Sequence, residues 1–133
     1  MKAVSPRQVT RFVPSCDQAL PIAEQTTITI RPLTVDEESI LDDTQWRVDA
    51  DGTRKFSFSS KMLMALHIGL VGIENFSDEN GAQIIVEREE FADEFGVKRI
   101  KNETLERIPK AIRDEIALKI ITSNSPTEQQ RKN

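Results

Sequence analysis

With 133 residues, the chain is long enough for one hydrophobic core but too short for two. Apolar residues make up 38% and charged residues 30%, which predicts a folded protein that is more polar than an average domain, with part of the chain disordered. The formal net charge of -4 gives no attraction toward a phosphate backbone or an anionic membrane, so we expect neither nucleic acid nor a membrane as a partner.

The cysteine content and the first residues indicate the compartment. Cys16 is the one cysteine, so the chain has no internal disulfide and no Cys-rich metal site, which favours a reducing environment. The opening MKAVSPRQVTRF lacks the apolar segment of a secretory signal. The longest apolar run, Met62 to Ile73, is shorter than the roughly 18 residues that a membrane-spanning helix needs. We therefore expect a cytoplasmic protein.

The two ends of the chain differ in composition from its middle. Residues 1–25 contain Pro6, Pro14 and Pro21 and no sustained hydrophobic period, which predicts an extended N-terminal arm. Residues 124–133 are polar throughout and predict a flexible tail. The single folded domain is therefore expected to span residues 26–123.

The first predicted elements of this domain are a strand and a short helix. Residues 26–31 (TTITIR) alternate, with two isoleucines on one face, and Pro32 ends the run. Thr34 and Glu37 have the spacing of a capping box, in which each side chain binds a backbone amide at the start of a helix. This helix is predicted to run to about Asp43.

A β-hairpin is predicted near residues 46–58. The segments 46–48 and 55–58 flank Asp51-Gly52, a pair that tolerates the positive φ of a tight turn. In this hairpin we expect Phe56 and Phe58 to lie on one face.

The next segment predicts a helix at about 60–72 that is apolar on nearly all sides. Such a helix must be covered by the hairpin, by the C-terminal helix or by another chain. Its candidate partner-binding residues share a face at i, i+3 and i+7, with one aromatic residue just beyond the helix: Leu63, Leu66, Leu70 and Phe76. The alternative is that Met62 and the three leucines form the core of this domain itself.

The remaining segments predict a turn, a strand and two helices. Residues 78–81 (DENG) favour a turn and residues 82–86 a short strand. Residues 88–95 predict an acidic helix. A longer amphipathic helix is predicted at about 104–122, with Pro109 in its first turn and isoleucines at every fourth position from 108 to 120. The fold class is therefore α+β, with short antiparallel strands and two main helices.

Residues capable of chemistry are scarce. His67 lies inside the apolar helix, which favours a polar edge position or a hydrogen-bonded core residue over a catalytic base, and Cys16 has no neighbour that would activate its thiol. The carboxylates lie on segments that read as exposed helix faces, and residues 78–81 lack the ligand spacing of a calcium loop. We therefore expect no catalytic residue, no cofactor and no metal, so that an enzyme is the remote alternative.

The order of four sequence blocks resembles a known group of proteins. The blocks are LPIAEQT at 20–26, IRPLTVDE at 30–37, GLVGIENFSDENG at 69–81, and Ile108-Pro109 followed by EIA at 115–117 and a terminal Lys-Asn. They are similar to small proteins encoded among phage and prophage tail genes, of the tail assembly chaperone kind. One departure is Ile73, where related sequences often have a tryptophan.

This resemblance implies a protein that holds an aggregation-prone tail component, typically the tape-measure protein, until the tail tube polymerises around it. The expected partner is thus a phage tail protein, the tape measure or the tail tube, with a homo-oligomer as a further option. The expected location is the host bacterial cytoplasm. The alternative function is a structural virion component of the tail, neck or baseplate, in which case the protein stays in the virion.

Overall fold

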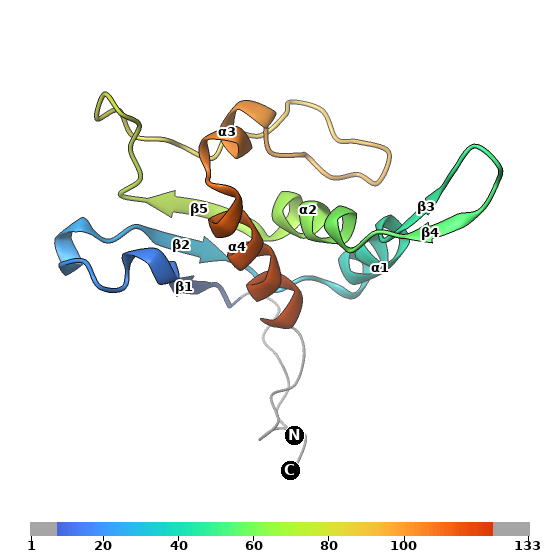
Figure 1. Ribbon diagram of the computed structural model, residues 1–133, viewed down its shortest axis with the longest axis horizontal. Helices are drawn as coiled ribbons and strands as arrows, with labels where there is room; N and C mark the ends of the chain where they lie inside the picture. Colours follow the sequence, from blue (N-terminus) through green and yellow to red (C-terminus); the bar gives the residue numbers. More distant parts are fainter. Residues whose placement is uncertain (1–7, 124–133) are drawn as a thin grey trace, which may run out of the picture.

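The computed structural model describes residues 8–123 and has an α+β fold (Figure 1). This part of the chain contains a three-stranded antiparallel sheet of order β1-β2-β5 and a separate two-stranded hairpin, β3-β4. Its α-helices are α1 (Val35–Thr44), α2 (Phe58–Gly69), α3 (Asn102–Arg107) and α4 (Lys110–Ser123). The predicted class, with short antiparallel strands packed on helices, is confirmed. The predicted tail at 124–133 lies outside the described residues.

The three-stranded sheet forms around the predicted alternating strand. Strand β2 (Thr27–Ile30) lies between β1 (Thr10–Phe12) and β5 (Leu70–Glu74). Ile28 and Ile30 are both buried, as their spacing predicted. Pairing of β2 with β5 brings together segments that are far apart in the sequence and places Leu70 opposite Ile30.

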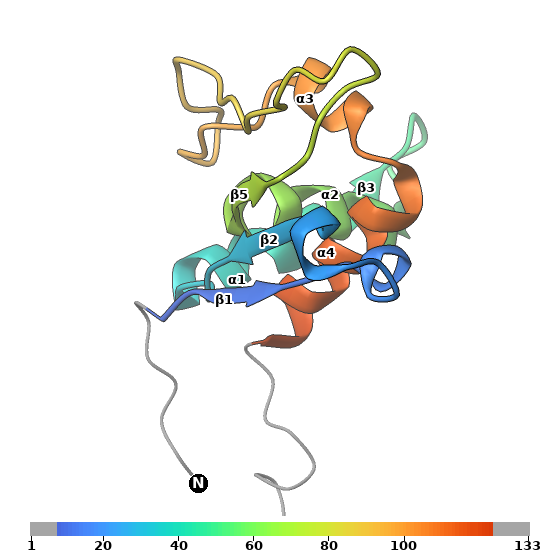
Figure 2. The same cartoon turned by 90° about the vertical axis from the view of Figure 1, so that its left-hand side faces the viewer.

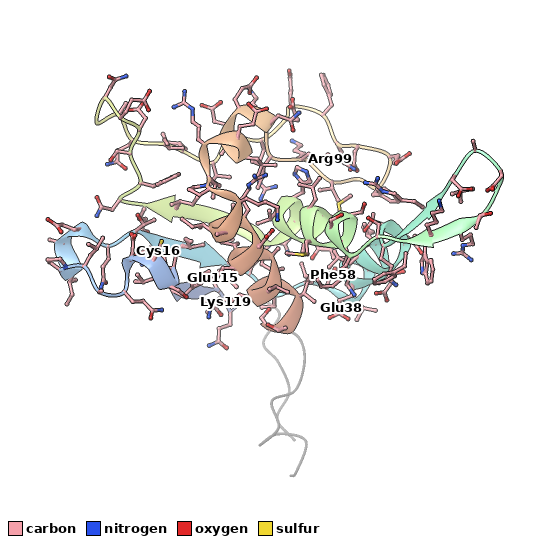
Figure 3. The ribbon with its side chains drawn as sticks, viewed as in Figure 1. Cys16, Glu38, Phe58, Arg99, Glu115 and Lys119 are labelled. Carbon is pink, nitrogen blue, oxygen red and sulfur yellow. The ribbon has the colours of Figure 1, made fainter. Side chains whose placement is uncertain are left out.

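Residues 8–25 form part of the folded domain, which corrects the predicted boundary at residue 25. Strand β1 pairs with β2, and Pro14 is buried. The Ser15 amide donates to the Glu115 carboxylate of α4 over 3.0 Å. The Lys119 ammonium lies 4.8 Å from the centre of the Phe12 ring. Figure 3 shows Glu115 and Lys119 on the same side of α4 as Cys16. This segment is therefore docked against α4, while residues 1–7 of the predicted arm lie outside the described part.

The capping box at the start of α1 is confirmed. The Glu37 amide donates to Thr34 Oγ1 over 3.2 Å, and the Thr34 amide donates to Glu37 Oε1 over 2.9 Å. The same carboxylate binds both terminal nitrogens of Arg31, at 2.8 and 2.6 Å. Glu37 therefore connects the end of the sheet to the start of the helix.

The predicted hairpin forms, but its second strand ends at Phe56, and Phe58, which was expected on this strand, begins α2. Strand β3 (Trp46–Val48) pairs with β4 (Arg54–Phe56), and Gly52 has a φ of 83° in the connecting turn. Figure 1 shows the hairpin projecting from the body of the molecule beyond α1 and α2.

Helix α2 ends earlier than predicted, because the apolar run continues as strand β5. Leu70 has an extended backbone (φ -77°, ψ 116°) and belongs to the sheet. At Gly69, an added Cβ would lie only 2.6 Å from Ile120 Cγ2, so α2 approaches α4 more closely here than any side chain would permit. This contact lies at the centre of the core.

The predicted C-terminal helix is two helices, α3 and α4, separated at Ile108-Pro109. A proline disfavours the helical conformation of the residue before it, and Ile108 accordingly has an extended backbone (φ -91°, ψ 120°). The isoleucine stripe still packs inward, since Ile108, Ile116 and Ile120 are buried and Ile112 contacts the core. The predicted packing face is confirmed although its helix is divided.

Two predicted elements between β5 and α3 do not form. Residues 82–86 make one isolated bridge, Ser77 with Gln83, across the predicted turn at 78–81, and no strand. Residues 88–95 are an irregular loop and not a helix. The Asp93 carboxylate accepts hydrogen bonds from the amides of Phe95 and Val97, at 2.8 and 3.0 Å, and thereby turns the chain back on itself. The two sides of this loop then pair, with Arg88 opposite Ile100.

Candidate protein-interaction surface

The structure places most of the predicted partner-binding residues in the core. Leu66 is 3% exposed and Leu70 is 0% exposed, and Leu70 lies in β5 and not on the helix face. Phe76 packs partly buried against the core, and Leu63 is exposed. The apolar helix is covered because α2 packs against both α4 and α1. The prediction of one accessible face is therefore wrong for Leu66 and Leu70, and the alternative of a core role holds for them.

A different apolar surface lies on the projecting hairpin. The strand register places Trp46 opposite Phe56 and Val48 opposite Arg54, and side chains two residues apart on a strand share a face. These residues therefore form one face of the hairpin, extended by Phe58 at the start of α2. We call this surface, made of Trp46, Val48, Arg54, Phe56 and Phe58, the aromatic face.

The aromatic rings of this face contact one another. The Trp46 and Phe56 ring centres lie 5.7 Å apart with an interplanar angle of 74°, an edge-to-face arrangement. The Phe56 and Phe58 rings are stacked, with centres 6.5 Å apart. The Arg54 guanidinium carbon lies 5.3 Å from the centre of the Trp46 ring, in range of a cation–π interaction. These contacts hold the rings as one pre-ordered surface.

Despite these contacts, the aromatic face stays open to solvent. Trp46 is 43% exposed, Val48 68%, Phe56 59% and Phe58 39%. A contiguous exposed apolar patch is typical of a binding surface, and aromatic residues and arginine carry most of the binding energy in protein interfaces. The sequence analysis expected Phe56 and Phe58 to share a face but named neither them nor Trp46 and Val48 as binding residues. The alternation of WRV and RKF across the turn contains the signal that would have found them.

The hairpin carries the basic side chains Arg47, Arg54 and Lys55 and the acidic side chains Asp49 and Asp51. Arg47 lies on the other side of β3, where its Nε donates to Ser60 Oγ over 2.9 Å. Within residues 8–123, neither Arg47 nor Arg54 forms an ion pair. Lys55 does pair with Asp49, at 3.1 Å. A partner with carboxylates beside an apolar group would therefore complement this surface.

His67 has a structural role at the buried end of α2. Its Nδ1 accepts a hydrogen bond from the Ile100 amide over 3.0 Å, and the side chain is buried. Burial, with the nearby positive charges of Arg99 and Arg88, lowers its pKa to about 4. The imidazole is therefore neutral at pH 7, and the predicted hydrogen-bonded core histidine is confirmed.

A pocket of about 420 Å³ lies beside His67, and charged groups line it. Arg31 and Glu37 in its wall bind each other, and this pairing lowers the pKa of Glu37. The Arg88 guanidinium donates to the carbonyl oxygens of His67 and Leu70 at the end of α2, and to that of Lys98 over 2.8 Å. These groups therefore connect the loop at 87–101 to α2, and their hydrogen-bonding capacity serves the fold.

The lone thiol is exposed and far from the aromatic face. Figure 3 shows Cys16 on one side of α4 and Phe58 on the other. Desolvation and a hydrogen bond to Asp17 raise the pKa of Cys16 above its ordinary value. The thiol is therefore protonated at neutral pH, which disfavours a nucleophile.

No group of three or more His, Cys, Asp or Glu side chains within residues 8–123 is arranged to hold a metal ion. None of the helices in that range combines the length and apolarity that crossing a bilayer demands.

Comparison with known proteins gives no relative, since no protein-family model, curated protein or solved structure matches this chain.

Proposed function

We propose that this chain is a non-catalytic phage tail assembly chaperone that binds a tail protein, the tape measure or the tail tube, through the aromatic face of its hairpin. The observation that carries the proposal is the exposure of Trp46, Phe56 and Phe58 as one connected surface. The link to tail assembly comes from the sequence resemblance. The aromatic face supports the binding role independently of that resemblance.

The shape of the hairpin suits this role. Because it projects from the body, the hairpin leaves room for a long helical partner to approach its aromatic face (Figure 1). An amphipathic helix presents anchors at i, i+3, i+4 and i+7, which match a row of apolar side chains. Cytoplasmic binding before the tube forms would keep such a helix from aggregating.

A structural virion component is the second candidate. It is favoured by a second exposed surface, the acidic loop at 87–95, in which Glu87, Glu89, Glu90 and Glu94 are exposed. A subunit with two complementary surfaces on different sides is suited to a ring. In that case the protein would be present in the mature virion.

The experiment is to co-express the chain with the tape-measure gene product of the same tail gene cluster and to purify by a tag on the tape measure. We expect co-purification of the wild type and its loss in Phe56→Ser. The matched control is Ile22→Ser, which also changes an exposed apolar residue but lies in the short 3-10 turn Ile22–Glu24, outside the hairpin. Equal capture of both folded variants would contradict the proposed site. Stoichiometric presence of the protein in purified particles would favour the virion component over the chaperone.

A further inference from the structure

We propose that the aromatic face of one copy binds the loop at 87–95 of a second copy, in a head-to-tail contact. The inference rests on the proposed function to the extent that both use the same face of the hairpin. The occupant is a second copy because the chain itself carries a surface that complements this face in both charge and apolar character.

The loop at 87–95 combines one apolar anchor with negative charge. Phe91 is 78% exposed, with no core contact to explain its position. Glu89, Glu90 and Glu94 lie beside it and are exposed. Within residues 8–123, none of these three glutamates forms an ion pair. The loop therefore offers free carboxylates around an aromatic side chain.

The loop holds a defined shape although it has no regular secondary structure. The Asp93 amide donates to the Val97 carbonyl over 2.9 Å, and the Asp93 carboxylate pairs with Arg99 at 2.7 Å. The Glu89 amide donates to the Arg99 carbonyl over 2.8 Å. Because the backbone is already ordered, less conformational entropy is lost when Phe91 is bound.

The hairpin supplies the complementary groups. Arg54 forms no ion pair within the described residues and lies against the exposed Trp46 ring, whereas Arg47 is on the other side of β3. Seating Phe91 against the aromatic face would bring the loop glutamates near Arg54. Opposite charges around an apolar centre favour association and fix its orientation.

The contact must join two copies. In Figure 2 the loop at 87–101 lies on the left of the view and the hairpin on the right, so the two surfaces lie apart within one chain. A symmetric contact between two aromatic faces would bring Arg54 near Arg54 of the other copy, whereas the loop at 87–95 offers exposed glutamates. The head-to-tail arrangement is therefore favoured over the symmetric one, and it generates a ring or an open chain of subunits. Such self-association would cover the aromatic face until a tail protein displaces it.

The test uses size-exclusion chromatography with light scattering on the full chain. We expect the wild type to self-associate as its concentration rises. Phe56→Ser destroys the hairpin surface and Phe91→Ser destroys the loop surface, so each variant alone should remain monomeric, with self-association weakened about tenfold or more. An equimolar mixture should form a heterodimer and nothing larger, because one intact hairpin and one intact loop remain.

Two results would overturn the inference: a wild type that stays monomeric at every concentration, or a mixture of the variants that forms no heterodimer. Arg54→Glu keeps every ring of the face, so it should also abolish self-association if Phe56→Ser fails to fold. Capture of the tape-measure protein is measured separately on Phe91→Ser, which keeps its hairpin. Absence of that capture in both the wild type and Phe91→Ser, together with heterodimer formation, would refute the chaperone proposal and leave this inference standing.

Discussion

The backbone amide of Ile100 donates a hydrogen bond to Nδ1 of His67 over 3.0 Å, and this bond fastens the loop at 87–101 to the buried end of α2. The bond requires an unprotonated Nδ1. Its strength is therefore coupled to pH, through the one histidine of the chain.

We predict that His67 makes the protein less stable in mild acid. Its pKa falls from an ordinary 6.5 to about 4 on folding, so between these values the unfolded chain binds a proton that the folded chain does not. The contribution of the neutral His67 to the free energy of unfolding is fully present above about pH 6.5. It is lost as the pH falls toward 4, by about 3 kcal/mol in total. Urea unfolding at pH 7 and pH 4.5 measures it.

The control for this prediction is His67→Gln, whose side chain does not titrate. Carboxylates add their own pH dependence to both proteins, so the relevant quantity is the difference between them. We expect the wild type to lose more stability than His67→Gln over this range. Parallel curves for the two proteins would contradict the assigned pKa.

The contact between α2 and α4 gives a second prediction, for Gly69→Ala. An added methyl at this position meets Ile120 Cγ2 at 2.6 Å, and overpacking of this kind costs about 1–3 kcal/mol. The matched control is Gly72→Ala in β5, where nothing lies within 4 Å of the added carbon. Thermal melts should separate the two variants. A Gly69→Ala protein as stable as Gly72→Ala would mean that the two helices pack less closely than described.

A third prediction concerns the isoleucine stripe of α4. Ile116→Asp should destabilise the domain by more than about 3 kcal/mol, because the carboxylate would be buried without a partner. Leu118→Asp, two residues along the same helix at an exposed position, should cost far less. Denaturant unfolding provides both values. A loss below about 1 kcal/mol in Ile116→Asp would indicate that the stripe faces a partner and not the core.

Elements with strong local signals could be predicted from the sequence. The capping box at Thr34 and Glu37 and the Asp51-Gly52 turn each depend on residues close together in the chain, and both form as expected. The end of α2 could not be predicted, because an apolar run such as 62–73 suits a buried helix and a buried strand equally. Only the pairing with β2 decides between them.

The loop at 87–101 shows where local reasoning fails. Its acidic segment suits an exposed helix, yet the Arg88 guanidinium and the Ile100 amide both bind groups at the end of α2. These contacts join positions far apart in the sequence, and they override the local helix preference. The break between α3 and α4, in contrast, could have been predicted from the sequence, because Pro109 disfavours a helical backbone at Ile108.

The candidate site was predicted only in part, for a related reason. The apolar character of residues 60–72 is visible in the sequence, but its cover by α1 and α4 is not, so Leu66 and Leu70 were assigned to the wrong surface. The hairpin has no such cover. Its aromatic face could be predicted from the register, and its exposure only from the complete fold.

The most direct test of the binding role uses Trp46, the one tryptophan of the chain, as its own reporter. It lies on the aromatic face and is open to solvent, so acrylamide should quench its fluorescence efficiently in the free protein. The tape-measure protein is prepared with its tryptophans replaced by phenylalanine and is then added to saturation. Our account predicts that binding protects Trp46 from quenching and shifts its emission to shorter wavelength. Binding that leaves both the quenching and the emission of Trp46 unchanged would contradict it.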